Sequence, residues 1–454
     1  MSPRLTGRLA RLSALGIAAL SAPLLMSTAA SAAGPLGSCA ATQAGTTITL
    51  QADCVTTAQI DVANGVTVDG NGFSITAIDP VAGNFSGAVL RSAPGTATTP
   101  ATMSVKNLTI TGSFAANNPA SLSGLYYDLA GGSITNVSIS GITVDSGSQA
   151  GRAVEVRNGG STTAPTLSID GLRVRNYNKS GVIIQGKTNY TATNMDIGPA
   201  TTRDGNQSVT LAAANSFTVF GGPRGTITNS KIAGNRWAPD DGNPGLPNAT
   251  IAGGILVIDS PSLTITGVTV TGVDSDNALY VSNDDTSTPS NVSITCSNLT
   301  RTSGGHADPT YGQAIDNDGG TGVVKLSAGS NTFSGWRVNT EGTIAPIVGA
   351  SCTPSQKATV TAKAKKDEVK AGKKIKLKGT ATPALAGVSV SLQLKVDGAF
   401  KTVSTSTLPA NGAFKLVTKA KKSMKHHHAK LRVVVGTGTL YAGGTSNVVK
   451  VHVI

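Results

Sequence analysis

Aromatic and charged side chains are scarce in this sequence. Phenylalanine, tryptophan and tyrosine make up 4% of the 454 residues, and charged residues make up 13%. So few aromatic rings argue against a long groove in which sugars stack on aromatic faces. Helical periodicity is almost absent as well. The glycine-rich stretch 64–75 therefore does not fit a dinucleotide-binding loop, which needs a helix after it, and we interpret its Asn and Gly residues as tight turns.

Long apolar runs are absent after residue 33. Before that point, three arginines precede the apolar stretch 12–26, and a small-x-small triplet follows at 30–32. This order is typical of a secretory signal peptide. A membrane anchor is the alternative, but the apolar stretch is shorter than the ~20 residues that a span needs. We expect residues 1–33 to be removed and the mature chain to be secreted, free or associated with a cell wall, with no transmembrane segment.

Cysteine is also rare, and the absence of a C-x-x-C pair argues against a zinc site. The four cysteines form an even set in a chain predicted to be exported, which indicates disulfides. Four cysteines allow three pairings. Proximity in the sequence favours the local one, Cys39 with Cys54 and Cys296 with Cys352. We expect the first bond to secure the segment that covers one end of the fold, and the second to tie a late part of the fold to its other end.

One motif returns throughout residues 103–299. Apolar and polar residues alternate around a central Asn or Gly, most clearly at 132–139, and a second short apolar run such as 180–184 follows. Each unit predicts two short strands joined by turns rich in Gly, Asn and Asp. The units recur at a drifting period of about 30 residues, which is typical of a solenoid. We predict an all-β fold, a parallel β-helix of about nine coils over residues 34–355 that begins with an N-terminal cap.

The central position of the motif is usually Asn, and nine N-x-[ST] triplets occur in the chain. These triplets fit the acceptor pattern for N-glycosylation. Two of them, at Asn107 and Asn136, coincide with the turn position of the repeat, which favours a structural role for these residues. We expect the stacked Asn side chains to hydrogen-bond one another along the solenoid.

The alternating I-x-N-x-x-I strand, followed by a small-Gly-apolar strand, resembles the repeat of the right-handed parallel β-helix in the pectate-lyase-like superfamily. The resemblance covers roughly residues 45–350. It implies a single-stranded right-handed solenoid, but that fold hosts lyases, hydrolases, epimerases, phage spikes and adhesins, so it implies no single activity. Residues 283–285 (Asn-Asp-Asp) and 304–306 (Gly-Gly-His) are similar to the N-x-D and G-H-G motifs of polygalacturonase-like hydrolases. Ala307 replaces the last Gly, and no R-x-K follows.

Carboxylates follow the second strand in three successive units. Stacked units lie ~4.8 Å apart, so these carboxylates should crowd together, and crowding raises a pKa or recruits a cation such as Ca²⁺. The candidate catalytic residues are Asp284, Asp285, His306 and Asp316. The candidate calcium ligands are Asp259, Asp284 and Asp318. The alternative is that these carboxylates only form turns.

Two further sets of residues are candidates for contact with a ligand. If the apolar residues of the second strand point inward, its outer face carries Glu155, Arg157, Gln185, Lys187, Tyr280 and Asp316. The loop 235–245 combines an aromatic ring with an arginine and two carboxylates, and its candidate polysaccharide-binding residues are Trp237, Asp240 and Asp241. An ordinary polar loop is the alternative for this segment.

The composition changes near residue 356. Residues 356–454 contain eighteen lysines and one arginine against three acidic residues, a net charge of +16. Seven short alternating segments predict a β-sandwich, and the end of the chain at 443–453 resembles bacterial Ig-like modules of secreted proteins. The charge indicates a polyanionic partner, an acidic polysaccharide or another cell-wall polyanion. Aromatic residues do not interleave with the lysines, which argues against nucleic acid.

Two functional hypotheses remain open. The protein is either a carbohydrate-active enzyme, a lyase or glycosidase acting on an acidic polysaccharide, or a non-catalytic surface protein that binds polysaccharide like an adhesin. The clustered acidic residues favour the first hypothesis, and the few aromatic rings favour the second. We expect a monomer with a signal peptide at 1–33, a β-helix domain at 34–355 and an Ig-like domain at 356–454.

Overall fold

The computed structural model is almost entirely β-structure. In the part of the chain that it describes there is no α-helix, only a short 3-10 helix, η1 (Lys422–Met424). The described residues are 35–114, 122–144, 150–201, 214–236, 252–283, 289–303, 312–318, 323–327, 330–347, 352, 356–382, 388–396, 398–409, 412–436 and 441–454. The predicted signal peptide lies outside them.

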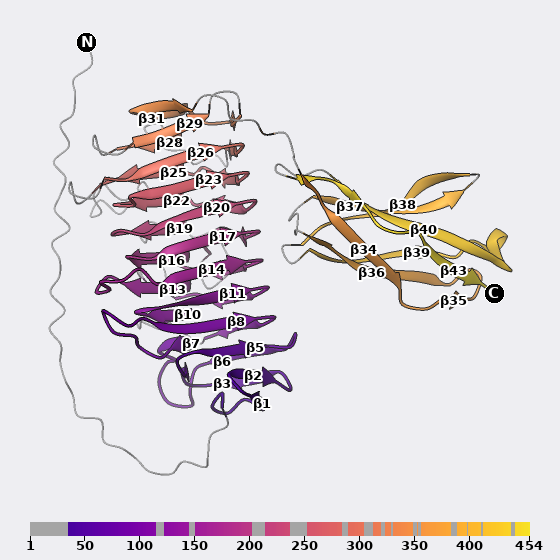
Figure 1. The fold of residues 1–454 in the computed structure, drawn as a ribbon, viewed down its shortest axis with the longest axis horizontal. Helices are drawn as coiled ribbons and strands as arrows, with labels where there is room; N and C mark the ends of the chain where they lie inside the picture. Colours follow the sequence, from indigo (N-terminus) through magenta and orange to yellow (C-terminus); the bar gives the residue numbers. More distant parts are fainter. Residues whose placement is uncertain are drawn as a thin grey trace.

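Three long sheets, which the chain visits in turn, make up the larger part of the fold (Figure 1). Sheet I has 12 strands: β1 (Ala41–Ala44), β2 (Thr47–Leu50), β5 (Val66–Asp69), β8 (Ala101–Lys106), β11 (Ala130–Thr135), β14 (Thr166–Asp170), β17 (Asn189–Thr193), β20 (Arg224–Thr228), β23 (Ser262–Thr266), β26 (Asn291–Thr295), β29 (Val323–Ser327) and β32 (Ile344–Ile347). Sheet II has 10 strands: β3 (Cys54–Thr56), β6 (Ser74–Ile78), β9 (Thr109–Ser113), β12 (Ser138–Ile142), β15 (Arg173–Tyr177), β18 (Asp196–Ile197), β21 (Lys231–Gly234), β24 (Thr269–Val273), β27 (Asn298–Thr302) and β30 (Thr332–Ser334).

Sheet III also has 10 strands: β4 (Ile60–Val62), β7 (Gly87–Ser92), β10 (Leu122–Asp128), β13 (Arg152–Asn158), β16 (Ser180–Gly186), β19 (Asn215–Phe220), β22 (Gly253–Ile258), β25 (Asn277–Ser282), β28 (Gln313–Asn317) and β31 (Val338–Gly342). Each strand pairs in parallel with strands of the coils before and after it, as β13 does with β10 and β16. The edge strand β1, in contrast, pairs antiparallel with β2. This arrangement is consistent with a parallel β-helix solenoid.

Each coil contains three strands, whereas the sequence pattern predicted two. The alternating segment 132–139 bends at Asn136, whose φ of 53° ends β11 and starts a new direction for β12. The same left-handed conformation recurs at the equivalent position of other coils. It is adopted there by Asn107, Gly171, Asn194, Asn229, Gly267 and Cys296. Asn and Gly adopt this conformation more easily than other residues, which explains their recurrence in the motif.

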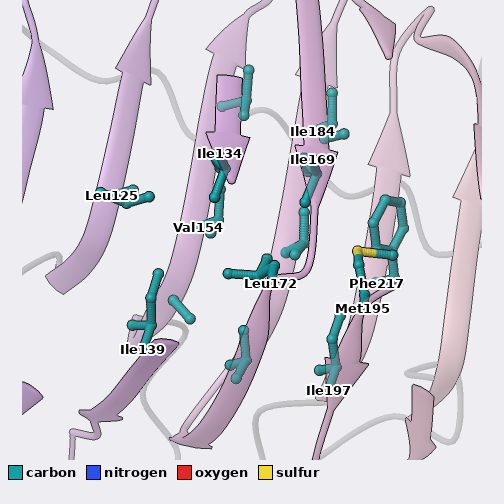
Figure 2. Packing of buried hydrophobic residues seen from close by; sticks show 14 of the residues in the cluster. Leu125, Ile134, Ile139, Val154, Ile169, Leu172, Ile184, Met195, Ile197 and Phe217 are labelled. Atoms are coloured by element: carbon teal, nitrogen blue, oxygen red, sulfur yellow. The ribbon is translucent and has the colours of Figure 1, made fainter. Parts of the chain in front are cut away.

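The interior of the solenoid is a single apolar core. The register places Ile134 beside Ile169, and Val154 beside Val182, in neighbouring coils, and all four side chains are fully buried. Figure 2 shows such residues stacked in rows between the sheets. Complete burial of one such side chain stabilises the fold by about 1.5–3 kcal/mol. Because the apolar residues point inward, alternate residues of each strand are left on the outer faces.

The Asn residues at the bends form hydrogen-bonded pairs, as expected from the sequence. Asn136 Nδ2 donates to Asn107 Oδ1 at 3.0 Å, and Asn107 Nδ2 donates to Asp69 Oδ1 at 3.2 Å. Asn229 Nδ2 similarly donates to Asn194 Oδ1. These bonds connect one coil to the next and satisfy side chains that the bend holds close to the backbone.

Both predicted disulfides are confirmed. Cys39 bonds to Cys54, with a Cα–Cα distance of 5.2 Å, next to the antiparallel β1–β2 pair at the N-terminal end of the solenoid. Cys296 bonds to Cys352, with a Cα–Cα distance of 5.4 Å, and Cys296 itself occupies one of the bends. The described part of the chain contains no helix with the length and hydrophobicity needed to cross a membrane.

The C-terminal strands have a hydrophobic core of their own. The strands are β33 (Gln356–Lys357), β34 (Thr359–Ala364), β35 (Glu368–Val369), β36 (Lys374–Thr382), β37 (Ser389–Val396), β38 (Ala399–Thr407), β39 (Ala413–Lys419), β40 (His427–Val435), β41 (Tyr441–Ala442), β42 (Gly444–Thr445) and β43 (Val449–Val453). A three-stranded sheet, β34-β36-β39, and a six-stranded sheet built on β43-β40-β37-β38 share that core. The seven strands expected from the sequence correspond to β34, β36, β37, β38, β39, β40 and β43.

Candidate functional site

Outward-facing side chains of sheet III form rows that run from coil to coil. In β13, Glu155 lies between two core valines and therefore faces outward, and the register aligns it with Tyr126 of β10. Tyr280 of β25, Asp316 of β28 and Glu341 of β31 are aligned in the same way at the other end of the sheet. These rows agree with the outer face expected from the sequence, and they bring together residues that lie far apart in the chain.

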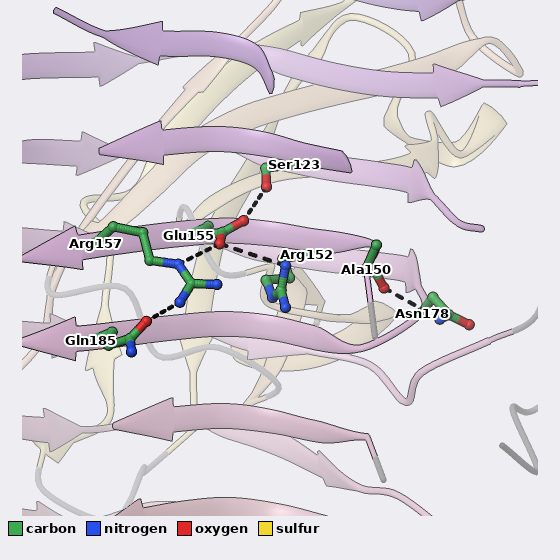
Figure 3. A network of polar contacts seen from close by, with 7 residues as sticks. All are labelled: Ser123, Ala150, Arg152, Glu155, Arg157, Asn178 and Gln185. Atoms are coloured by element: carbon green, nitrogen blue, oxygen red, sulfur yellow. Dashed lines mark hydrogen bonds and ion pairs between the residues drawn. The ribbon is translucent and has the colours of Figure 1, made fainter. Parts of the chain in front are cut away.

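One row contains a buried carboxylate surrounded by cations. Glu155 is 1% exposed although it faces outward. Arg157 Nε donates to Glu155 Oε1 at 2.6 Å, Arg152 Nη1 lies 3.5 Å from the same oxygen, and Ser123 donates to Glu155 Oε2. Arg157 also donates to the side-chain oxygen of Gln185 in the next coil. Figure 3 shows Glu155 at the centre of these contacts. A carboxylate removed from water needs such partners, so these contacts offset the cost of burying Glu155.

A further cation lies near Arg152. Lys179 directly precedes β16, and burial, together with the nearby Arg152, lowers the pKa of Lys179 to about 7. Burial also lowers the pKa of the Arg152 guanidinium. We call Arg152 and Arg157, which contact Glu155, and Lys179, which lies near Arg152, the cationic network.

The opposite end of sheet III is acidic. Burial, together with repulsion from the nearby Glu341 and Asp318, raises the pKa of Asp316 to about 7. Tyr280 donates its hydroxyl to Asp318 Oδ2 at 2.7 Å, and Gln313 donates to Glu341 Oε2 at 2.7 Å. We call Asp316, Asp318 and Glu341 the acidic patch. The crowding expected from the sequence is therefore present for Asp316 and Asp318, and Asp316 is a carboxyl that exchanges its proton near neutral pH.

Asp259 lies apart from the acidic patch. It follows Ile258, the last residue of β22, which pairs with Ser282, and its own φ is 52°. Asp259 is 5% exposed and lines a groove beside the strand ends. Among the described residues, no three His, Cys, Asp or Glu side chains are gathered so that they could hold a metal ion. The calcium site proposed from Asp259, Asp284 and Asp318 stays a prediction, since Asp284 lies outside the described residues.

The groove has a volume of about 560 Å³ and crosses the turns that lead from sheet III to sheet I. It is lined by Ala164, Lys187, Asn189, Gly221, Gly222, Arg224, Asp259, Pro261, Pro289, Ser290, Asn291 and Val323. Lys187 directly follows β16 of the cationic network, and Arg224 starts β20. Val323, in contrast, starts the strand that follows β28 of the acidic patch. The volume is in the range of small-ligand sites.

Hydrogen bonds between successive turns hold the floor of this groove. The Ser260 amide donates to Ser290 Oγ at 3.1 Å, and Ser260 Oγ donates to the Pro223 carbonyl at 2.8 Å. The Gly222 amide donates to the Asp259 carbonyl at 2.8 Å. Because three coils are connected in this way, the groove exists before any ligand binds.

Several residues predicted as site residues lie outside the described part of the chain. They are Trp237, Asp240, Asp241, Asp284, Asp285 and His306. Asp284 and Asp285 follow Asn283, which is described and whose side chain accepts a hydrogen bond from the Ser290 amide. Their roles stay predictions.

Sequence reasoning overlooked Arg152, Lys179 and Glu341. In the strand register, Arg152 pairs with Ser180, the residue after Lys179, and Glu341 pairs with Asp316. The three overlooked residues therefore lie beside residues that the sequence analysis had already named as candidates. Their positions in or next to the second strand of the repeat could have identified them. The loops between coils differ in length, which made it difficult to align these strands from the sequence. In comparisons with known proteins, no family model matches the chain, and no curated protein matches it.

Proposed function

We propose that this protein is a secreted glycosidase that hydrolyses an acidic polysaccharide bound along sheet III. In this proposal the solenoid is a right-handed β-helix like that of the pectate-lyase-like superfamily, and the C-terminal domain is Ig-like. Two disulfides support a location outside the cytoplasm, since such bonds persist in oxidising compartments. The single observation that carries the proposed activity is Asp316, a carboxyl with a pKa of about 7 beside two other carboxylates.

Recognition of an acidic sugar is supported by the charges at one end of the groove. Lys187 and Arg224 are exposed and line it, and the cationic network lies on the strands before it. A guanidinium pairs well with a planar sugar carboxylate through two parallel hydrogen bonds. The groove crosses successive coils ~4.8 Å apart, so neighbouring sugars of one chain can contact neighbouring coils.

The acidic patch supplies groups for hydrolysis. A protonated Asp316 donates its proton to the glycosidic oxygen as the bond from that oxygen to the anomeric carbon breaks. Water attacks the anomeric carbon, and Asp318 accepts the proton that the water releases. An acid with a raised pKa beside a second carboxylate is the arrangement that glycosidases use. Activity should therefore fall as the pH rises above about 7, because Asp316 then loses its proton.

Purified protein incubated with polyuronates tests the proposal. New reducing ends, without absorbance from unsaturated uronate, are expected, and Asp316→Asn should lower the rate by about 10²–10⁴-fold. Asp61→Asn, an exposed carboxylate at the other end of sheet III, is the matched control and should leave the rate unchanged. Unsaturated products would instead indicate a lyase, for which Lys179 is the candidate base. Binding without any product would support the non-catalytic hypothesis.

A further inference from the structure

Six lysines surround a cleft at one end of the C-terminal domain. The cleft has a volume of about 570 Å³. It is lined by Lys365, Lys366, Glu368, Val369, Lys370, Lys373, Lys374, Lys376 and Ile454. All six lysines are exposed, and we call them the lysine cleft. The cleft lies in the second domain, far in sequence from the residues proposed for hydrolysis, so it does not rest on that proposal.

The backbone around the lysine cleft is held in place by hydrogen bonds. The Lys365 amide donates to the Lys376 carbonyl at 2.9 Å, and the Lys373 amide donates to the Lys370 carbonyl at 3.0 Å. The Ile454 amide donates to the Val369 carbonyl at 3.1 Å. β34, β35 and β36 therefore meet the end of β43 in a fixed arrangement, and the lysines extend from a rigid frame.

The described lining of the lysine cleft carries more positive charge than negative charge. Within the part of the chain that the structure describes, none of the ion pairs includes one of the six lysines. Glu368 is the one carboxylate side chain in the lining, and it pairs with His452 at 3.2 Å. Positive charges gathered in this way repel one another, and a bound anion relieves that repulsion.

The cations in this lining are all lysines rather than arginines. The planar fork of arginine suits bidentate pairing with a carboxylate or a phosphate, whereas lysine acts as a compact point charge that binds phosphate without that geometry. We propose that the lysine cleft binds a polymer of phosphodiester units at the cell surface and thereby attaches the protein there. The β-helix and the C-terminal domain then recognise two different anions.

Binding of the full-length mature protein to polyphosphate, measured at about 50 and 200 mM salt, tests this proposal. The triple variant Lys366→Gln, Lys370→Gln, Lys373→Gln should weaken binding at least tenfold. It should also reduce the slope of log K against log salt by about 2, because fewer counterions are released. The control is Lys401→Gln, Lys415→Gln, Lys430→Gln, which removes the same charge from exposed positions outside the cleft and should weaken binding less than threefold.

Three outcomes would overturn the proposal. Equal losses in the two triple variants would mean that binding depends on the total charge of the domain, and no binding by the parent protein would remove the site. Polygalacturonate bound at the lysine cleft as tightly as polyphosphate would refute the preference for phosphate. Melting curves of both variants verify that they fold. The rate at which the lysine variants hydrolyse polyuronates is measured separately. This rate tests the proposed glycosidase activity and does not test the lysine cleft.

Discussion

Replacing Asp316 with Asn should change how the stability of the protein depends on pH. Burial and the neighbouring Glu341 and Asp318 raise the pKa of Asp316 to about 7 in the folded protein, from an ordinary value of 3.8. A raised pKa in the folded state means that the folded protein binds this proton more tightly than the unfolded chain does. The resulting stability is complete below pH 3.8 and is lost as the pH rises through about 7. Asn keeps the size of the side chain and cannot ionise, so the variant lacks this loss.

The size of the effect follows from the same pKa. A change from 3.8 to about 7 is equivalent to about 4 kcal/mol between the two protonation states, at about 1.4 kcal/mol for each pH unit. Asp316 is only partly buried, so water screens part of this energy. We therefore expect Asp316→Asn to be more stable than the parent protein by about 2 kcal/mol at pH 9. Near pH 4, where the parent carboxyl is largely protonated, the two proteins should be nearly equal.

Urea unfolding of both proteins at pH 4 and pH 9, followed by circular dichroism, measures this difference. Every other titrating group is shared, so its contribution cancels when the variant is compared with the parent at each pH. Asp61→Asn, at an exposed position on β4 of the same sheet, is the matched control for exchanging a carboxylate for an amide. If Asp316→Asn changes stability equally at both pH values, or destabilises the protein at pH 9, then Asp316 is not held in an unfavourable ionised state.

Four further predictions concern the rest of the chain. Asn136→Ala should lower stability by about 1–3 kcal/mol, because Ala is strained at the positive φ of this position and cannot make the hydrogen bond to Asn107. Asn136→Gly should cost less, because Gly adopts this φ easily and loses only the hydrogen bond. Urea unfolding of the two variants measures the difference. Replacing Cys39 and Cys54 together by Ser should lower stability by about 2–4 kcal/mol in the same assay, and an unchanged midpoint would contradict a stabilising role. Residues 356–454 should fold alone and melt cooperatively, because they contain their own core, and a flat melting curve would contradict this. Millimolar calcium should raise the melting temperature if Asp259, Asp284 and Asp318 bind it, Asp318→Asn should remove that shift, and no shift in the parent would reject the calcium site.

The repeat and the second domain could be predicted from sequence because both depend on local alternation. The strand expected at 374–379 corresponds to β36, Lys374–Thr382, since Ile375 and Leu377 alternate with lysines that remain in water. The disulfide between Cys39 and Cys54 was also accessible, because these cysteines are only 15 residues apart. Cys296 and Cys352, which are 56 residues apart, then remained as the second pair. Each of these features needs only neighbouring residues, and the burial of one strand face then determines the rest.

The third strand of each coil was missed although the sequence contains its signal. Ile134 and Val137 are three residues apart, so a straight strand would point them to opposite faces. Both are buried in the core. The chain must therefore turn between them, and it does so at Asn136. The odd spacing of these two apolar residues, together with the Asn between them, is the sequence signal of the bend.

The site was harder to predict because it depends on how coils align across loops of unequal length. Asp316 and Glu341 are partners only because β28 and β31 stack with a particular register. Lys179 reaches Arg152 for the same reason, across β13 and β16. A shift of one residue in a loop prediction exchanges the inner and outer faces of the strand that follows. Sequence alone could therefore name acidic and basic candidates without saying which of them meet.

Two carboxylates of sheet III, Glu155 on β13 and Asp316 on β28, have opposite surroundings, and this contrast is the physical reason for choosing Asp316. Glu155 is almost fully buried, yet Arg157 and Arg152 both contact it, so its charge is neutralised and serves the structure. Asp316 has no ion pair among the described residues; two carboxylates, Glu341 and Asp318, lie near it, and the side chain of Asn277 is its hydrogen-bonding neighbour. A fold that needed only a stable surface at β28 would gain from an arginine or an apolar residue there. Keeping an unneutralised carboxyl beside others costs stability near neutral pH, and such a cost is expected where a proton has to be given up during a reaction.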